Sequence, residues 1–350
     1  MHLSQCGCVF ASSLSTAILV TQSATGISPE LSAIQAPVHA LLDRVSGEIK
    51  RIVLSDFAQI EEVNEHLLFM RGKLFRPALL LLSSHVGAEP DDDVLTLAAV
   101  VELVHLATLV HDDAVDHSVL RRGLPTVNTL WTHQVAIIMG DYLYSRSVSE
   151  LARVGNLQAL EVLAGAANDM AIGEMRQLTS FDALDFTEDD YYRLIAAKTA
   201  SLMSAACEMG AIAGDQGSRR ALATYGHNLG MAFQIADDLL DYTGTEEITG
   251  KPTGHDLRER KVTLPLVGAL ANATPGEEKE IRTFFTITDP NDEEIARVVG
   301  IVEECGGLAY ARERATQYAE AAHDTLSGLA EGPELSALSE AIAYAVDRRR

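Results

Sequence analysis

Two aspartate clusters of identical spacing are the residues of this chain best suited to chemistry. They cover residues 112–116 and 237–241, and each reads D-D-x-x-D. Each lies in an apolar stretch of helical periodicity, where residues four positions apart share a face, so the first and last aspartates of each cluster point the same way. A buried carboxylate is costly without a compensating cation. Mg²⁺ is the cation that we expect, because it binds one or two carboxylates together with substrate phosphates.

Basic residues flank both clusters, although the chain is strongly acidic. Those that stand out are Lys73, Arg76, Arg121, Arg122, Lys198, Lys251 and Lys261. Any one of them is most simply a solvated surface charge. Together they predict a magnesium–diphosphate site, in which carboxylates hold the metal and cations hold the phosphate oxygens. His105 lies two helical turns before Asp112, so it is either a buried core histidine or a donor to a second phosphate.

Composition narrows the function classes. The chain has 350 residues and a net charge of −23, which argues against nucleic acid or an anionic membrane surface as a partner. Its four cysteines have no metal-finger spacing, which favours a reducing cytoplasm. The apolar runs are judged too short to span a bilayer, so we expect no transmembrane segment. Residues 1–28 are predicted to be a disordered extension or a misassigned start, with a signal peptide as the alternative.

Apolar residues recur with helical period almost everywhere from Pro29 onward. The predicted helices cover residues 30–53, 57–70, 74–87, 92–117, 127–154, 157–180, 188–213, 218–244, 262–272, 276–286, 292–304, 307–331 and 334–347. Thr187 and Asp190 have the spacing of a capping box. No segment alternates with period two, and turn residues gather at 121–125 and 243–254. The sequence therefore predicts an all-α protein, with a loop after the second aspartate cluster that is placed to close over a site.

Several segments, in this order, resemble those of the trans-isoprenyl diphosphate synthases, or polyprenyl synthetases. They are GKLFRP, ELVHLATLVHDDAVD, RRG, KT, FQIADDLLD, GKP and RKVTLP. The resemblance covers about residues 30–350 and implies one polyprenyl synthetase domain over 29–350. It implies a single large helical bundle around a deep central cavity, with the two aspartate clusters facing each other across its mouth. It also implies a homodimer.

The resemblance assigns roles to single residues. The implied catalytic residues are Asp112, Asp113, Asp116, Asp237, Asp238, Asp241 and Lys198. The implied ligands of two or three Mg²⁺ ions, bridged by substrate diphosphate, are Asp112, Asp116 and Asp237. The implied isopentenyl diphosphate site consists of Lys73, Arg76, His105 and Arg122. The implied allylic diphosphate site consists of Arg121, Lys198, Thr199, Gln234, Lys251 and Lys261. Arg71 departs from the glycine that the family often has before Gly-Lys, which leaves the shape of that loop open.

The implied reaction is a magnesium-dependent head-to-tail (1′–4) condensation of isopentenyl diphosphate with an allylic diphosphate. The metal and the cations would stabilise the charge of the departing diphosphate. The double bond of isopentenyl diphosphate then attacks the allylic carbocation and a proton is lost, with the released diphosphate as the expected base. Apolar walls must keep water away from the cation.

Product length should depend on the residues that precede the first cluster on its helix. Ala107, Val104 and Leu103 are predicted to line the wall of the product tunnel, and in the resembling family a bulky residue at the Ala107 position shortens the product. Because none of the three is aromatic, we expect a long product of about 30 to 50 carbons. The alternative is a farnesyl or geranylgeranyl product. Its tunnel floor would come from Phe181, Met170, Met175 or Met139.

Two other function classes stay open. A terpene cyclase also uses acidic helix clusters with magnesium, but it does not need the GKLFRP segment or His105, which serve a second diphosphate. A non-catalytic partner subunit of a two-component synthase is expected to have lost part of an aspartate cluster, and both are complete here. Peripheral membrane contact for product release is a further expectation.

Overall fold

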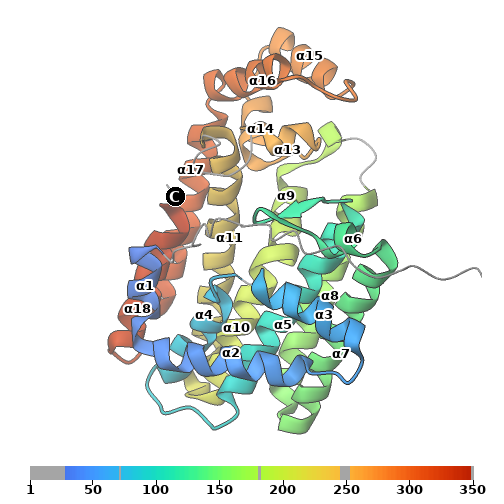
Figure 1. Ribbon diagram of the computed structural model, residues 1–350. Coiled ribbons are helices and arrows are strands. Elements are labelled where there is room, and N and C mark those ends of the chain that lie inside the picture. The colour runs from blue at the N-terminus through green and yellow to red at the C-terminus, as the bar shows by residue number, and fades with distance from the viewer. Residues whose placement is uncertain (1–27, 71, 180–182, 245–252, 348–350) are drawn as a thin grey trace, which may run out of the picture.

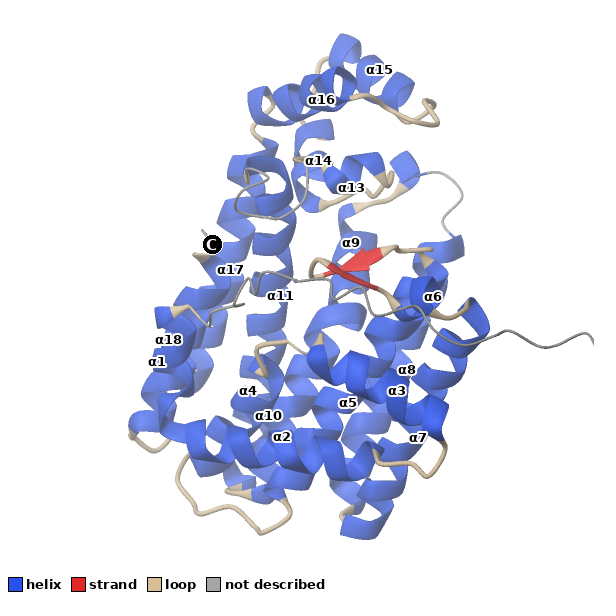
Figure 2. Cartoon of the chain, in the orientation of Figure 1, coloured by secondary structure: helices blue, strands red, loops and turns tan. Residues whose placement is uncertain are grey.

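The computed structural model describes residues 28–70, 72–179, 183–244 and 253–347. These residues are almost entirely helical, and one very short hairpin supplies the strands among them (Figure 2). The predicted all-α class is confirmed. The predicted N-terminal extension falls outside the described residues, apart from position 28.

The helices form a lower bundle and an upper cap, and two long helices connect them (Figure 1). The connecting helices α11 (Arg219–Thr243) and α17 (Gly307–Leu326) pack along each other. The bundle contains α2 (His39–Val53), α3 (Ala58–Phe69), α4 (Phe75–His85), α5 (Val94–Val115), α7 (His133–Val154), α8 (Leu157–Thr179) and α10 (Ser201–Ala213). The cap contains α13 (His255–Arg258), α14 (Leu264–Leu270), α15 (Pro275–Phe284) and α16 (Asp292–Glu304). The remaining helices are α1 (Pro29–Gln35), α6 (Val127–Leu130), α9 (Glu188–Ile195) and α18 (Pro333–Val346).

The hydrophobic core follows this division. The largest apolar cluster fills the bundle around α4 and α5, and a second one lies in the cap between α14 and α16. A third cluster, with Tyr191, Ile235 and Leu264, joins the two. Each fully buried leucine or valine stabilises the fold by roughly 1.5–3 kcal/mol. The junction between bundle and cap is therefore fixed by packing from both sides.

Helix α5 is apolar on almost every side. It is the one described helix that is long and apolar enough to cross a bilayer by length and composition, which corrects the expectation that no such run exists. Its side chains are buried against α2, α4 and α7. A helix surrounded by other helices has to be apolar all round, and α5 has the burial of such a core helix.

Four features depart from the predicted helices, each for a local reason. The helix predicted over 30–53 is broken at Pro37, which has no N–H to donate. The helix predicted over 127–154 is broken before α7, where the Thr132 hydroxyl caps the Val135 N–H. The short helix α13 was not predicted. Residues 188–213 form one helical run, but a π-helical turn, η3 (Ala196–Ala200), separates α9 from α10. The capping box of Thr187 and Asp190 is confirmed.

A fifth difference lies outside the predicted helices: the hairpin of β1 (Leu120–Arg121) and β2 (Leu124–Pro125). Its two-residue turn consists of Arg122 and Gly123, both with left-handed φ, at 54° and 76°. This is the pattern of a type I′ turn, which matches the twist of the flanking strands. With only two residues in each strand, the hairpin shows no alternation that a sequence could reveal.

Candidate active site

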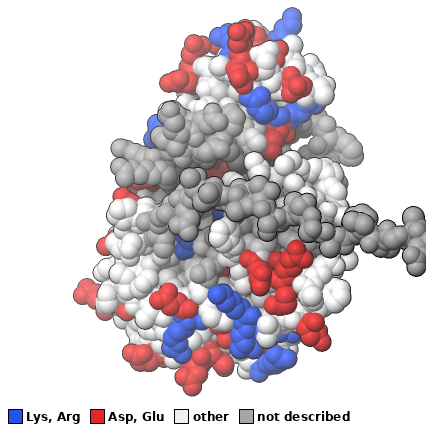
Figure 3. Space-filling model, viewed as in Figure 1, with Lys and Arg blue, Asp and Glu red and all other residues white. Residues whose placement is uncertain are grey.

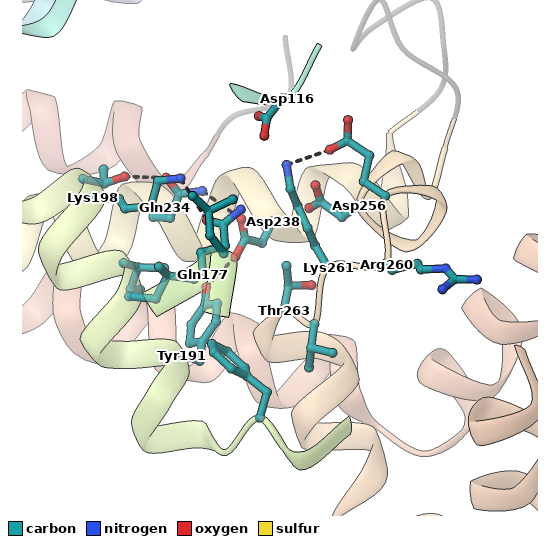
Figure 4. Close-up of a pocket in the computed structure, with 17 residues that line it drawn as sticks. Asp116, Gln177, Tyr191, Lys198, Gln234, Asp238, Asp256, Arg260, Lys261 and Thr263 are labelled. Carbon is teal, nitrogen blue, oxygen red and sulfur yellow. Dashed lines mark hydrogen bonds and ion pairs between the residues drawn. The ribbon is translucent and has the colours of Figure 1, made fainter. Parts of the chain in front are cut away.

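A cavity of about 560 Å³ lies at the junction between bundle and cap. Figure 4 shows residues from five segments converging on it: the end of α5, α8, the run from α9 through η3, α11, and the link between α13 and α14. Six of the residues singled out in the sequence line it: Asp116, Lys198, Thr199, Gln234, Asp238 and Lys261. Both aspartate clusters thus border one cavity.

The two aspartate clusters show the same pattern of solvent exposure. In the first cluster Asp113 is buried, Asp112 is half-buried and Asp116 is exposed. In the second cluster Asp238 is buried, whereas Asp237 is exposed. The middle aspartate of each motif is therefore the buried one, and Asp116 and Asp238 are the two that line the cavity.

Both buried aspartates have fixed partners. The Nε of Arg121 donates to the two carboxylate oxygens of Asp113, at 2.9 and 2.8 Å. The Tyr191 hydroxyl donates to Asp238 at 2.6 Å, and Gln234 Nε2 donates to the other oxygen of Asp238 at 2.8 Å. Burial is the main cause that raises the pKa of Asp238 well above its ordinary value. These two carboxylates hold neighbouring groups in place.

A chain of hydrogen bonds links Asp238 to the π-helical turn η3. Gln234 accepts a 2.7 Å hydrogen bond from the Thr199 hydroxyl while its amide donates to Asp238. A π-helical turn inserts an extra residue into the helix, which rotates the side chains that follow. Lys198 and Thr199 lie in this turn and both line the cavity. The Lys198 ammonium forms an ion pair with Glu174 and donates to Gln177 at 2.9 Å.

Asp112 carries the clearest sign of uncompensated negative charge. Burial raises its pKa to about 6; Glu174 and Asp116 add to the shift, while Lys198 and Arg121 oppose it. Among the residues that the structure describes, no three His, Cys or carboxylate groups form a ready-made metal cluster. A hard divalent cation that takes carboxylates from the protein and its other oxygens from a phosphate suits this arrangement.

The two arginines of the hairpin contact different parts of the protein. Arg121, on β1, is half-buried against Asp113, while Arg122 donates from Nη1 to the Met70 carbonyl at 2.8 Å. A Cβ on Gly72 would lie 2.7 Å from the Arg122 guanidinium, so a larger residue there would displace the end of this side chain. Arg71 itself lies outside the described residues, and the loop shape that it put in doubt stays open there.

A second cluster of cations lies beside α5. Arg76 Nη1 donates to His105 Nε2 at 3.1 Å, and because arginine has no acceptor, His105 must carry its proton on Nδ1. Burial, and then the charges of Arg76, Arg122 and Arg121, keep the pKa of His105 well below its ordinary value. Burial also lowers the pKa of Arg76 to about 10, which leaves it charged at neutral pH.

Lys73 lies at the edge of this cation cluster. Its side chain is exposed, and its carbonyl accepts a 2.6 Å hydrogen bond from Gln35. The four residues predicted for isopentenyl diphosphate do not line the cavity described above. Arg121 lies between the two regions, because it influences the pKa of both His105 and Asp112.

The segment after α11 returns to the second aspartate cluster. Asp241 anchors it: its carboxylate accepts from the Asp256 N–H at 3.0 Å, and its carbonyl accepts from the Gly254 N–H at 2.9 Å. Lys261 forms a 2.6 Å ion pair with Glu259, drawn as a dashed line in Figure 4. Burial, followed by the charge of Asp241, raises the pKa of Asp256 to about 6. Lys251 lies outside the described residues.

The residues assigned to the tunnel wall are all buried in the bundle core. Ala107, Val104 and Leu103 have exposures of 3%, 1% and 0%. Of the alternative floor residues, Met139 and Met170 are buried, whereas Met175 is 59% exposed and does not close an internal tunnel. Phe181 lies outside the described residues.

Several polar residues of this region were not predicted from the sequence to belong to the site. They are Glu102, Glu174, Gln177, Tyr191, Asp256 and Glu259. Glu102 had a usable signal, because it is the one acidic residue of α5 before the aspartate motif, and it is 8% exposed. The others come from α8, α9 and α13 with the turn that follows it. Gln177, Tyr191, Asp256 and Glu259 line the cavity, and Glu174 pairs with Lys198. The periodicity of any one helix carries no sign of this convergence.

Comparison with known proteins agrees with this geometry. Residues 57–302 match the family model described as Polyprenyl synthetase. The chain is 37% identical over 317 residues to the all-trans-nonaprenyl-diphosphate synthase (geranyl-diphosphate specific) of Rhodobacter capsulatus, covering 90% of this chain and 97% of that protein. It is also 37% identical over 293 residues to the short chain isoprenyl diphosphate synthase of Methanothermobacter thermautotrophicus, covering 81% and 89%.

A solved structure gives the same result at the level of the fold. The polyprenyl synthase of Caulobacter crescentus CB15, complexed with calcium and isoprenyl diphosphate, superposes with a TM-score of 0.86 at 35% identity, over 91% of this chain and 98% of that one. The all-α architecture is thus the isoprenoid synthase fold. The chain belongs to the polyprenyl synthetase family and is a trans-prenyltransferase.

Proposed function

We propose that this protein condenses isopentenyl diphosphate with an allylic diphosphate and releases a long-chain trans-polyprenyl diphosphate of about 30 to 50 carbons, the length for which a wall of small and aliphatic residues leaves room. The observation that carries the proposal is the cavity bordered by both aspartate clusters, with Lys198 and Lys261 on its wall and the Arg76–His105 pair beside it. The allylic diphosphate would bind at Lys198 and Lys261, and isopentenyl diphosphate would bind at the Arg76–His105 pair.

Asp112, Asp116 and Asp237 would hold two or three Mg²⁺ ions together with the allylic diphosphate. Bound magnesium supplies Lewis-acid stabilisation of the departing diphosphate. Lys198 and Lys261 bind the same phosphate oxygens, and Thr199 with Gln234 keeps the Lys198 turn in register with Asp238. Arg121 and Lys251 complete the allylic set.

Isopentenyl diphosphate would bind to Lys73, Arg76, His105 and Arg122. The neutral His105 keeps a donor on Nδ1, and the two arginines supply the positive charge. Glu102 attracts both arginines and limits their mutual repulsion. The apolar face of α5 then excludes water from the path of the growing chain.

Product analysis tests this function directly. With Mg²⁺, isopentenyl diphosphate and a labelled allylic diphosphate, the purified protein should give polyprenyl diphosphates, and excess chelator should abolish the activity. A cyclic hydrocarbon product would instead indicate a terpene cyclase. Absence of turnover without another polypeptide would indicate a partner subunit of a two-component synthase.

The tunnel wall has its own test. Ala107→Tyr should shorten the product to about 15 to 20 carbons, because a buried aromatic ring fills the space next to α5. Ala107→Ser is the matched control and should leave the length unchanged. If the tyrosine variant binds the allylic diphosphate normally yet makes the full-length product, α5 does not form the wall.

A homodimer in the cytoplasm is the state that we infer for the protein. Helices α7 and α8 lie next to each other and expose Ile137, Ile138 and Ile172, at 50%, 61% and 42%. An apolar surface of this kind is typical of a subunit interface. Cys207 and Cys305 are both unpaired thiols, in keeping with a reducing compartment.

Product release would involve peripheral contact with a membrane at the lower end of the bundle. Lys50 and Arg51 are exposed at the end of α2, and Leu54 and Phe57 follow at 65% and 58% exposure. Figure 3 shows basic side chains low on this face, with acidic ones beside them, and Arg51 itself pairs with Glu48 and Glu150. Apolar side chains beside a small basic patch favour binding at a lipid surface.

A further inference from the structure

Two histidines meet at a point outside the cavity just described. His117 Nδ1 and His133 Nε2 lie 2.9 Å apart, and the rings cross at 86° with their centroids 4.7 Å apart. Both residues are exposed. They come from different elements, because His117 follows the end of α5 and His133 is the first residue of α7.

The backbone holds both histidines in defined positions. His117 has a left-handed φ of 53°, and the Ser118 N–H donates to the Asp113 carbonyl at 3.0 Å, which is the pattern of a Schellman cap. Glycine is the usual residue at such a position, and histidine is an uncommon one. His133 follows the Thr132 cap of α7. Neither ring depends on a flexible loop for its position.

The pair also brackets a structural unit. Residues 118–132 leave the bundle at His117, form the hairpin and α6, and return at His133. Inside this excursion Thr126 and Asn128 both donate to the Ser118 carbonyl, at 2.7 and 3.0 Å. The excursion carries Arg121 and Arg122. Whatever holds the two imidazoles together therefore holds both ends of the segment that presents these arginines.

We propose that His117 and His133 chelate a divalent transition-metal ion of the Zn²⁺, Cu²⁺ or Ni²⁺ class, and that this ion clamps the base of the arginine-bearing excursion. Imidazole nitrogens suit these ions, whereas Mg²⁺ prefers oxygen ligands, so the site is chemically distinct from the aspartate clusters.

The distance between the two nitrogens is close to the one that a shared ion needs. With zinc–nitrogen bonds of about 2.0–2.1 Å and tetrahedral angles, the two ligand nitrogens lie roughly 3.3 Å apart, so the rings need to separate by about 0.4 Å. No third His, Cys or carboxylate group completes the set within the described part of the chain, so water molecules fill the other positions. Exposure of both rings gives the ion and its waters access.

Cu²⁺ is the first probe. One equivalent of Cu²⁺, added to the full-length protein in excess Mg²⁺, should give an electron paramagnetic resonance spectrum with coupling to two imidazole nitrogens. His117→Gln and His133→Gln should each remove that signature. His323→Gln, which changes an exposed histidine on α17, should keep it. A two-nitrogen spectrum that survives in both single variants would overturn the proposal.

Zn²⁺ is the second probe and tests the clamp. In excess Mg²⁺, Zn²⁺ should raise the melting temperature of the wild type and slow hydrogen exchange in residues 118–132. The apparent affinity should fall at least about tenfold in each histidine variant, since one of two ligands is lost. Equal Zn²⁺ effects in wild type and variants would place the ion on the aspartates and refute the clamp. These readouts need no turnover, so they stand apart from the proposed activity.

Discussion

At the scale of single residues, each aspartate motif contains one buried aspartate among more exposed ones. Asp113 and Asp238 are buried and orient Arg121, Tyr191 and Gln234. The other aspartates are more exposed. A buried, charge-paired carboxylate and a solvent-facing one should respond differently to the same isosteric change, which makes the division testable.

Asp113→Asn should lower kcat/KM for the allylic diphosphate by about 10- to 100-fold without changing the Mg²⁺ concentration that gives half-maximal rate. The change removes the charge that orients Arg121 and leaves the cavity-side carboxylates intact. Asp116→Asn should instead raise the Mg²⁺ requirement. Steady-state kinetics over a range of Mg²⁺ concentrations separates the two. A shifted Mg²⁺ requirement in Asp113→Asn would mean that Asp113 binds the metal.

The pKa of Asp112, raised to about 6, predicts a pH-dependent stability. A carboxyl group with a raised pKa in the folded state stabilises the fold below its unfolded pKa, and this contribution is lost as the pH rises through about 6. Metal-free Asp112→Asn should therefore be more stable than the wild type at pH 7–8, by about 1–3 kcal/mol. The difference should vanish near pH 4.

Urea unfolding in the presence of chelator, repeated between pH 4 and pH 8, measures this effect. In the wild type the affinity for Mg²⁺ should fall by up to about tenfold per pH unit below pH 6, because the ligand must be ionised. An Asp112→Asn variant that is less stable than the wild type at every pH would contradict the assigned shift.

At the scale of elements, the contact between α11 and η3 sets the position of Lys198 and Thr199. Gly230 on α11 makes this contact possible, because a Cβ there would lie 2.5 Å from the Cα of Ala200. The neighbouring atom is backbone, which cannot move aside as a side chain can. Close approach of the two elements is what lets Gln234 bridge Thr199 and Asp238.

Gly230→Ala should destabilise the fold by about 1–3 kcal/mol and should also lower kcat, because the π-helical turn is pushed away from the second aspartate motif. Gly300→Ala is the matched control: a methyl group added to this helical glycine would have no atom of the described residues within 4 Å, and alanine there should be neutral or slightly stabilising. Thermal unfolding and steady-state kinetics test both variants. Equal stability and equal kcat in the two variants would show that the contact between α11 and η3 does not position the π-helical turn.

At the scale of the whole molecule, the exposed face of α7 and α8 should determine assembly. Ile138→Arg places a charge in the middle of this face and should convert a dimer to a monomer, because an unpaired charge is costly in an apolar interface. Leu54→Arg, at a similarly exposed leucine between α2 and α3, is the control and should leave the assembly unchanged. Sedimentation velocity measures the mass. A wild-type monomer, or an Ile138→Arg dimer, would contradict the assigned interface.

The sequence by itself determined the all-α class, most helix positions and the residue types of the site. Helical period is a local property, and the aspartate motifs with their flanking cations have spacings that only one kind of ligand explains well. Helix α16 begins and ends at the predicted residues, because an Asn291 capping box starts it. Short features without periodicity, such as the hairpin and α13, were not predicted.

Only the tertiary structure decided which carboxylates are buried and which residues they contact. Asp112 and Asp113 are adjacent residues of the same type, yet Asp112 is half-buried and Asp113 is buried and held by Arg121. The pairing of Lys198 with Glu174, and of His117 with His133, likewise joins segments from different elements. Burial and charge pairing depend on neighbours brought together by folding, and a pattern along one helix carries no information about the helix packed against it.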